Sequence, residues 1–139
     1  MPEFQTHLRI QMEKNNTHLA GEYFVAAELY RRGFSVGMTI GNAKSIDILA
    51  NKNEISVAIQ VKAIRNKKSI GWPIMLDKVE IGIIYIFVNL NDQEQPDFFI
   101  CTAQEAKDNI KQYSTRGIFD LTTILRFDFK DRWDKIIND

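Results

Sequence analysis

The stretch that decides the fold is residues 46–63, which read IDILANKNEISVAIQVKA. Its two ends, Ile46–Ala50 and Glu54–Ala63, are rich in β-branched and other apolar residues, which are typical of strands. Between them, Asn51-Lys52-Asn53 supplies the polar residues of a tight turn. The stretch therefore predicts a β-hairpin.

Polar side chains interrupt both strands of this hairpin. Asp47 stands in an otherwise apolar run, although aspartate is depleted in strands. Because side chains alternate between the two faces of a strand, Gln60 and Lys62 share the face opposite to Ile59 and Val61. Polar groups on a buried strand need partners. Alternatively, Asp47 caps a turn, and Gln60 and Lys62 lie on the solvated face of an edge strand.

A helix is predicted before the hairpin, over about Thr17–Arg32, and a glycine follows it as at many helix C-termini. Leu19, Glu22 and Leu29 recur at helical spacing, so the Glu22 carboxylate is expected to point toward the sheet. A lone carboxylate on a buried stripe costs several kcal/mol (about 3–5) unless something binds it. The alternatives are a half-exposed position at the helix margin, or an ion pair with Lys62. His18 is expected to be a helix-start residue rather than a ligand.

The rest of the chain adds strands and short helices. The segment 64–78 is polar and predicts a loop or a short irregular helix. Thr102 with Glu105 forms a capping-box pattern that opens a helix reaching about Tyr113. The other predicted elements are strands at 34–40, 83–90 and 97–101 and a short helix at 131–137 that docks Trp133. This order predicts an α/β fold with a mixed central β-sheet flanked by helices, in a single domain spanning residues 1–139.

The interruptions at Glu22, Asp47 and Gln60 have one common explanation if their side chains converge. Two carboxylates and an amide carbonyl form a hard oxygen site suited to Mg²⁺ (or Mn²⁺). Lys62, two residues from Gln60, is placed to orient a water or to stabilise a negatively charged transition state. Oxygen ligands beside a lysine suit the hydrolysis of a phosphodiester.

These residues resemble the motif of the PD-(D/E)XK nuclease superfamily. The resemblance lies in Gly21-Glu22, in residues 43–50 (AKSIDILA) and in residues 59–63 (IQVKA), and it extends over most of the chain. It is most similar to a group of small stand-alone bacterial members. It implies a restriction-endonuclease-like αβββαβ core and a metal-dependent endonuclease that acts on DNA.

By the family pattern, Asp47 is the principal metal ligand, Gln60 occupies the second ligand position, Lys62 is the catalytic lysine and Glu22 is the helix carboxylate. Two residues depart from the pattern. Ile46 replaces the proline that names the motif, at a position that is loosely kept. Gln60 replaces the usual acid and removes one negative charge, although active members with glutamine at this position are known.

The overall charge excludes a globally cationic surface, because 18 Lys and Arg balance 18 Asp and Glu. A local basic run follows the second hairpin strand, where Arg65, Lys67 and Lys68 come soon after Lys62. With Lys44, these residues are candidates for a phosphate-binding rim beside the site. The alternative is a solvated loop.

Composition also indicates the cellular compartment in which the protein is expected. Cys101 is the one cysteine, so no internal disulfide is possible, and a cytoplasmic location is expected. The N-terminus is too polar for a signal peptide, and the longest apolar run, residues 81–88, is far shorter than the roughly 20 residues that span a bilayer. We expect no membrane association.

The sequence leaves three functions open. The first is the DNA endonuclease, working as a possible homodimer because each chain carries one site. The second is a nuclease-fold protein that binds nucleic acid or a protein partner without cleavage, which the neutral Gln60 favours. The third is a structural or partner-binding module that has kept the fold.

Overall fold

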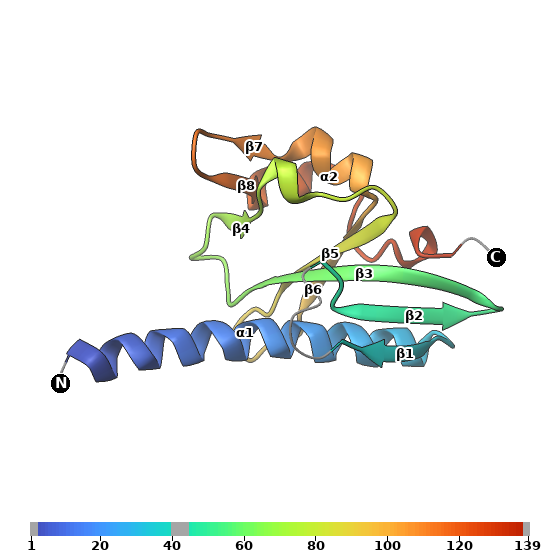
Figure 1. The fold of residues 1–139 in the computed structure, drawn as a ribbon, viewed down its shortest axis with the longest axis horizontal. Helices are drawn as coiled ribbons and strands as arrows, with labels where there is room; N and C mark the ends of the chain where they lie inside the picture. The colour runs from blue at the N-terminus through green and yellow to red at the C-terminus, as the bar shows by residue number, and fades with distance from the viewer. Residues whose placement is uncertain (1–2, 40–44, 138–139) are drawn as a thin grey trace.

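The computed structural model describes residues 3–39 and 45–137, which form two β-sheets and several helices (Figure 1). The elements, in chain order, are α1 (Glu3–Arg31), β1 (Ser35–Met38), β2 (Ile48–Lys52), β3 (Ile55–Ile64), β4 (Gly71–Pro73), η1 (Leu76–Lys78), β5 (Ile83–Asn89), β6 (Asp97–Cys101), α2 (Ala103–Asn109), β7 (Lys111–Gln112), β8 (Gly117–Asp120), α3 (Leu121–Arg126) and η2 (Trp133–Lys135). None of the described helices is both long enough and apolar enough to cross a bilayer.

The larger sheet has the strand order β1-β2-β3-β5-β6. Its β3–β5 pair is parallel and its other pairs are antiparallel, so the predicted mixed central sheet is confirmed. The predicted hairpin is also confirmed: β2 pairs with β3, with Lys52 opposite Ile55. The turn lies later than predicted, because Asn51 and Lys52 belong to β2 and the two turn residues are Asn53 and Glu54. Both have positive φ (52° and 64°), as in the two-residue turns that suit the twist of a hairpin.

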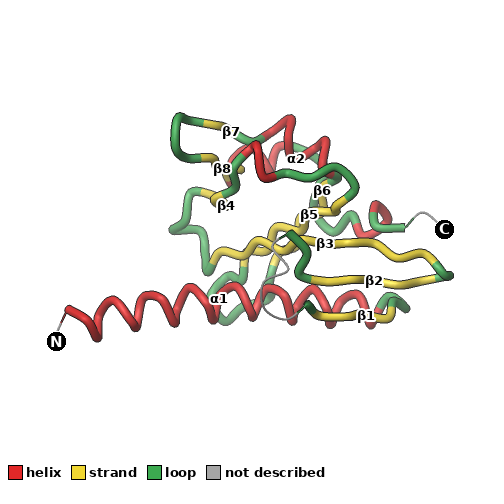
Figure 2. The backbone as a smooth tube through the Cα atoms, in the orientation of Figure 1, coloured by secondary structure: helices red, strands yellow, loops and turns green. Residues whose placement is uncertain are grey.

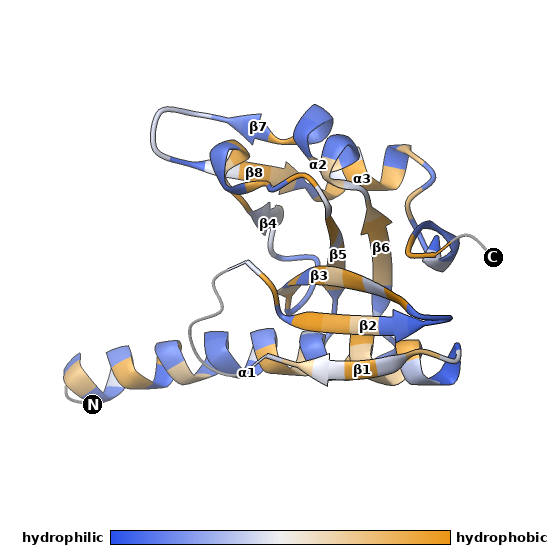
Figure 3. Cartoon of the chain, turned by 45° about the vertical axis from the view of Figure 1, so that its right-hand side comes forward, coloured by the Kyte–Doolittle hydropathy of each residue, from blue (hydrophilic) through white to orange (hydrophobic). Residues whose placement is uncertain are grey.

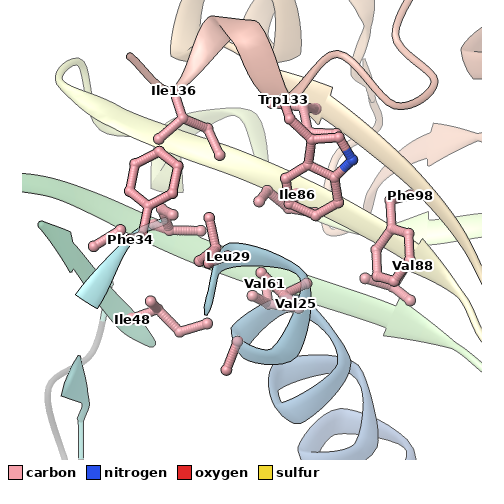
Figure 4. Close-up of a cluster of buried hydrophobic side chains, with 14 of the residues drawn as sticks. Val25, Leu29, Phe34, Ile48, Val61, Ile86, Val88, Phe98, Trp133 and Ile136 are labelled. Atoms are coloured by element: carbon pink, nitrogen blue, oxygen red, sulfur yellow. The ribbon is translucent and has the colours of Figure 1, made fainter. Parts of the chain in front are cut away.

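Both faces of the larger sheet are covered. Figure 1 shows α1 along one side, and the smaller β4-β8-β7 sheet with α2 on the opposite side. On the α1 side, Val25 and Leu29 pack with Val61 and Ile86 in one apolar cluster (Figure 4). On the other side, Trp72 contacts Phe87 edge-on, at 5.6 Å between ring centroids. The central strands therefore form a platform that is packed on both sides.

The first helix is longer than the sequence analysis predicts. It begins at Glu3 rather than near Thr17, and its N-terminal half extends past the sheet (Figures 1 and 2). Figure 3 shows polar and apolar residues mixed along this half. The buried residues of the helix begin at Gly21. The prediction for Leu19 is wrong, because its side chain is 41% exposed where the helix has not yet reached the core.

The second half of the chain departs most from expectation. The segment 64–78, predicted as a loop or a short irregular helix, contains the short helix η1 and also the unpredicted strand β4. The helix predicted to reach Tyr113 ends at Asn109. The following residues pair as β7 with β8, so pairing in a hairpin overrides helix propensity there. The capping box at Thr102 and Glu105 is confirmed, and so is the burial of Trp133 in a short terminal helix.

Candidate active site

Asp47 lies at a bend just before β2. Its N–H donates to the Ile59 carbonyl oxygen at 2.9 Å, while Ile59 also pairs with Ile48. Two residues thus oppose one, which is the count that defines a β-bulge, and bulges redirect side chains. The carboxylate Oδ2 of Asp47 accepts a hydrogen bond from the Val61 N–H at 2.8 Å. This bond explains why an aspartate is tolerated at the end of a strand.

Glu22 reaches Asp47 from α1. The Glu22 side chain is buried, and its ion-pair partner among the described residues is His18, at 3.0 Å between Oε2 and Nε2. His18 also lies 3.9 Å from Asp47, measured from Nε2 to Oδ1. One ligand atom from each of the three residues lies within 4.8 Å of the other two. The predicted convergence of Glu22 and Asp47 is therefore observed, and Glu22 pairs with His18 rather than with Lys62.

The electrostatics of Glu22 are unfavourable for its charged form. Burial raises the pKa of the Glu22 carboxyl, and the neighbouring charge of Asp47 raises it further, while His18 acts in the opposite direction. Two carboxylates held this close repel each other unless a cation lies between them or one of them takes up a proton. The pair therefore has the electrostatic character of a cation site.

Lys62 and Gln60 lie on the face of β3 that points away from Ile59 and Val61. Both line a cavity of ≈ 660 Å³ between β3 and the smaller sheet. Burial lowers the pKa of Lys62, and Asp47 acts against this shift, which places the ammonium within electrostatic reach of the carboxylate. No hydrogen bond in the described structure joins Gln60 to Glu22 or Asp47. The structure thus brings Glu22 and Asp47 together, while Lys62 and Gln60 both face the cavity, with Lys62 near enough to Asp47 for that charge to affect its pKa.

The candidate phosphate-binding residues are spread around one end of β3. Lys44 lies outside the described residues. Lys67 and Lys68 are exposed on the turn that follows the strand. Arg65 is exposed beside Asp92, at 3.6 Å, and lines a groove of ≈ 330 Å³ that also contains Lys14 of α1. An open groove of mixed charge therefore runs between the projecting half of α1 and this turn, because its lining also contains Glu13.

His18 is the member of the cluster that sequence reasoning placed elsewhere. The expectation that it starts the helix is wrong, because α1 begins at Glu3 and His18 lies well inside it. The signal was present in the spacing of His18 and Glu22, which are four residues apart and so share one helix face. The bend at Asp47 brings a third polar group to that face.

The three side chains fit a divalent cation. Carboxylate oxygens suit Mg²⁺ and Mn²⁺, and an imidazole extends the range to other divalent transition metals. His18 has a second arrangement open to it, because its hydrogen-bonding distance to Glu22 allows it to orient that carboxylate instead of binding the ion. The donor set is therefore compatible with the metal that the sequence resemblance implies.

Comparison with known proteins supports this fold. No protein-family model matches the chain, and no curated protein sequence matches it either. Solved structures do match, among them the Holliday junction resolvase Hjc of Archaeoglobus fulgidus and the bacterial homing endonuclease I-Ssp6803I. The chain has the PD-(D/E)XK nuclease fold. The sequence resemblance is thereby confirmed at the level of architecture.

The structural similarity covers nearly the whole of each chain. The resolvase superposes with a TM-score of 0.58 at 15% identity, over 86% of this chain and 93% of its own. The homing endonuclease superposes with a TM-score of 0.60 at 12% identity, over 88% of this chain and 91% of its own. At such low identity the likeness establishes the restriction-endonuclease-like fold alone, and function rests on the site.

Proposed function

We propose that this protein is an endonuclease that hydrolyses phosphodiester bonds of DNA with Mg²⁺ or Mn²⁺. The observation that carries the proposal is the pair Glu22 and Asp47. Two different elements hold these carboxylates within 4.8 Å of each other, and burial and mutual repulsion raise the pKa of Glu22. Among the described residues, no lysine or arginine forms an ion pair with Glu22. A divalent cation resolves this repulsion.

Glu22 and Asp47 would hold the ion, and the surrounding groups would fix their orientation. The Val61 N–H holds one oxygen of Asp47, and His18 holds Glu22. When bound, a divalent ion polarises the phosphate and lowers the pKa of a coordinated water. Gln60, the neutral residue at the second ligand position of the family pattern, is assigned a weaker contact through its carbonyl oxygen.

Lys62 would stabilise the charge that develops during hydrolysis. Its ammonium lies in a largely buried setting, where a hydrogen bond to a phosphate oxygen is stronger than in water. The same ammonium can hold the attacking water. Because burial lowers the pKa of Lys62 while Asp47 opposes that shift, loss of Asp47 should also perturb the lysine.

DNA as the substrate is supported by two observations. The similar structures are those of a Holliday junction resolvase and a homing endonuclease. Lys14 and Arg65 line a groove that also holds Glu13, and Lys67 and Lys68 are exposed on the turn that follows Arg65. We assign these four cations, with Lys44, to contacts with DNA phosphates.

A homodimer belongs to the same proposal, because two strands of a duplex call for two sites. The projecting half of α1 carries exposed apolar side chains at helical spacing, Phe4, Leu8 and Met12. Analytical ultracentrifugation of the purified protein measures the oligomeric state, and a monomer at all concentrations contradicts this part of the proposal.

The test is cleavage of supercoiled plasmid and of single-stranded DNA with Mg²⁺, with Mn²⁺ and with EDTA. The expected result is metal-dependent nicking that disappears in Asp47→Ala and in Lys62→Ala. Asp108→Ala and Lys107→Ala are matched controls, because they remove the same side-chain types from α2, on the side of the larger sheet opposite α1. Nicking that survives in Asp47→Ala, or that persists in EDTA, refutes the proposal.

The alternative is DNA binding without cleavage, and the missing charge at Gln60 favours it. Gln60→Glu separates the two, because a carboxylate at this position should strengthen Mn²⁺ binding if the side chain faces the ion. Isothermal titration of the variant and the original protein measures this. Unchanged affinity places Gln60 away from the ion, and binding of DNA without nicking by both proteins supports the alternative.

A further inference from the structure

The cavity beside Lys62 combines apolar walls with positively charged side chains. Its floor is Gln60 and Lys62 of β3, and its walls are the segment from Pro73 through η1 and the turn between β7 and β8. Most of the surface of the lining is apolar, with Ile70, Ile74 and Ile118 among its residues. Every charged residue of the lining is a cation, namely Lys62, Lys78 and Arg116. The cavity therefore joins an apolar interior to a uniformly positive edge.

An aromatic side chain is exposed at this cavity. Tyr113, in the turn between β7 and β8, is 61% exposed although it lines an otherwise apolar surface. Ile70, also in the lining, is 74% exposed. A flat ring beside apolar walls suits stacking on a nucleobase, and neighbouring cations suit the phosphate attached to it. At ≈ 660 Å³, the cavity lies within the range of about 300–1,000 Å³ that holds small ligands.

The walls of the cavity are tied together before any ligand arrives. Gln112 of β7 accepts a hydrogen bond from the Leu76 N–H at 2.8 Å and donates to the Arg116 carbonyl oxygen at 3.0 Å. The main chains of the two walls also touch, because a Cβ at Gly117 would collide with the Ile74 carbonyl oxygen. The cavity is thus a formed site, which lowers the entropic cost of binding.

We propose that this cavity receives an unpaired nucleotide of the DNA substrate, with its base against Tyr113 and its phosphate at the cationic edge. This inference rests on the proposed nuclease function, since Lys62 belongs both to the cavity and to the active site. A base inside a duplex cannot enter, because it is stacked and paired, and leaving the stack costs least where a base has no partner. The preferred DNA is therefore one with an extrahelical or single-stranded nucleotide next to the bond to be cut.

The test measures binding rather than cleavage. Fluorescence anisotropy compares a labelled duplex carrying one extra unpaired nucleotide with the matched, fully paired duplex, in EDTA and again with Ca²⁺. The full chain should bind the first about tenfold more tightly, as expected for one stacked base. Tyr113→Ala should abolish this preference, and Tyr113→Phe, which keeps the ring, should retain it.

The control is Tyr23→Ala, which removes an equally exposed tyrosine (62%) from α1, on the opposite side of the sheet. It should leave the preference unchanged. Equal affinity for the two duplexes, or a preference that persists in Tyr113→Ala, overturns the inference and leaves the nuclease proposal to the plasmid assay. Failure to bind either duplex or single-stranded DNA overturns both proposals.

Discussion

Alanine in place of Gly21 should push α1 away from the sheet. Gly21 is buried where the helix crosses β3, and a Cβ there would lie 2.6 Å from the Ala63 Cβ and 3.6 Å from Val61 Cγ1. Carbon atoms pack at about 3.5–4.0 Å, so the helix must withdraw by about 1 Å. Because Glu22 is the next residue, this withdrawal also moves its carboxylate relative to Asp47.

Two opposing effects set the magnitude. Overpacking of a core costs about 1–3 kcal/mol. Removing a glycine from a helix interior returns about 0.5–1 kcal/mol. The expected net loss for Gly21→Ala is therefore about 0–2.5 kcal/mol in the free energy of unfolding. Asn16→Ala, at an exposed position of the same helix, is the control and should be neutral or slightly stabilising.

The assay is urea unfolding of the single variants and of the double variant Gly21→Ala/Ala63→Gly. The second substitution removes the atom that the new Cβ would strike, so the double variant should be more stable than the sum of the single effects predicts. Mn²⁺ titration should show weaker binding in Gly21→Ala, although no ligand is changed. If Gly21→Ala is more stable than the original protein and shows no coupling with Ala63→Gly, the close approach is not a constraint and the reasoning fails.

Two further predictions concern single carboxylates. Glu22→Gln removes a buried charge beside Asp47, so in EDTA the free energy of unfolding, measured with urea, should rise by about 0.5–2 kcal/mol. The variant should also lose Mn²⁺ binding. A lower free energy of unfolding would show that the contact with His18 outweighs the repulsion. Asp120→Ala removes the N-cap of α3, where Oδ1 accepts from the Thr123 N–H at 2.7 Å, and should cost about 1 kcal/mol at neutral pH in the same assay. The hydrogen bond from Lys111 lowers the pKa of Asp120 to about 2. Because this pKa is lowered on folding, the stabilisation is complete above the ordinary value of 3.8 and is lost as the pH falls toward 2. The stabilities of the original protein and the variant should therefore converge on acidification, and a gap that persists at pH 2 contradicts the assignment.

The hairpin and its polar interruptions were predictable because both signals are local. Alternation along residues 54–63 separates Ile59 and Val61 from Gln60 and Lys62, and the structure places the two sets on opposite faces. Glu22 was identified from its helical stripe and is buried as expected. In each case, a few neighbouring residues decide the orientation of the side chain.

The smaller sheet was not predictable from such local patterns. Its strands are short, and β4 pairs with β8 across more than 40 residues of chain, with Gly71 opposite Asp120. The physical requirement there is close contact, since a Cβ at Gly71 would collide with the Phe119 carbonyl oxygen. The sequence alone does not show that Gly71 and Gly117 make such close contacts, because the contacting residues are distant along the chain.

The sequence pattern underestimates the length of α1 for a related reason. An apolar stripe predicts the part of a helix that packs, and in α1 the buried residues begin at Gly21. The preceding residues are helical without a core to cover, and they contain no proline or glycine from Glu3 onward to interrupt the helix. His18 was consequently assigned to the helix start, although it lies next to the two carboxylates.

The placement of Glu22 also argues against a purely structural module. Among the described residues, the buried polar or charged ones are Glu22 and Asn89. Asn89 accepts a hydrogen bond from the Asn91 N–H at 2.9 Å, so it has a structural role in the turn after β5. Glu22 instead approaches a second carboxylate, and both its burial and that neighbour disfavour its charge. A protein that needed only a packed interface between α1 and β3 would be more stable with an apolar side chain at this position. The retained carboxylate is therefore better explained by a cation that Glu22 and Asp47 bind together.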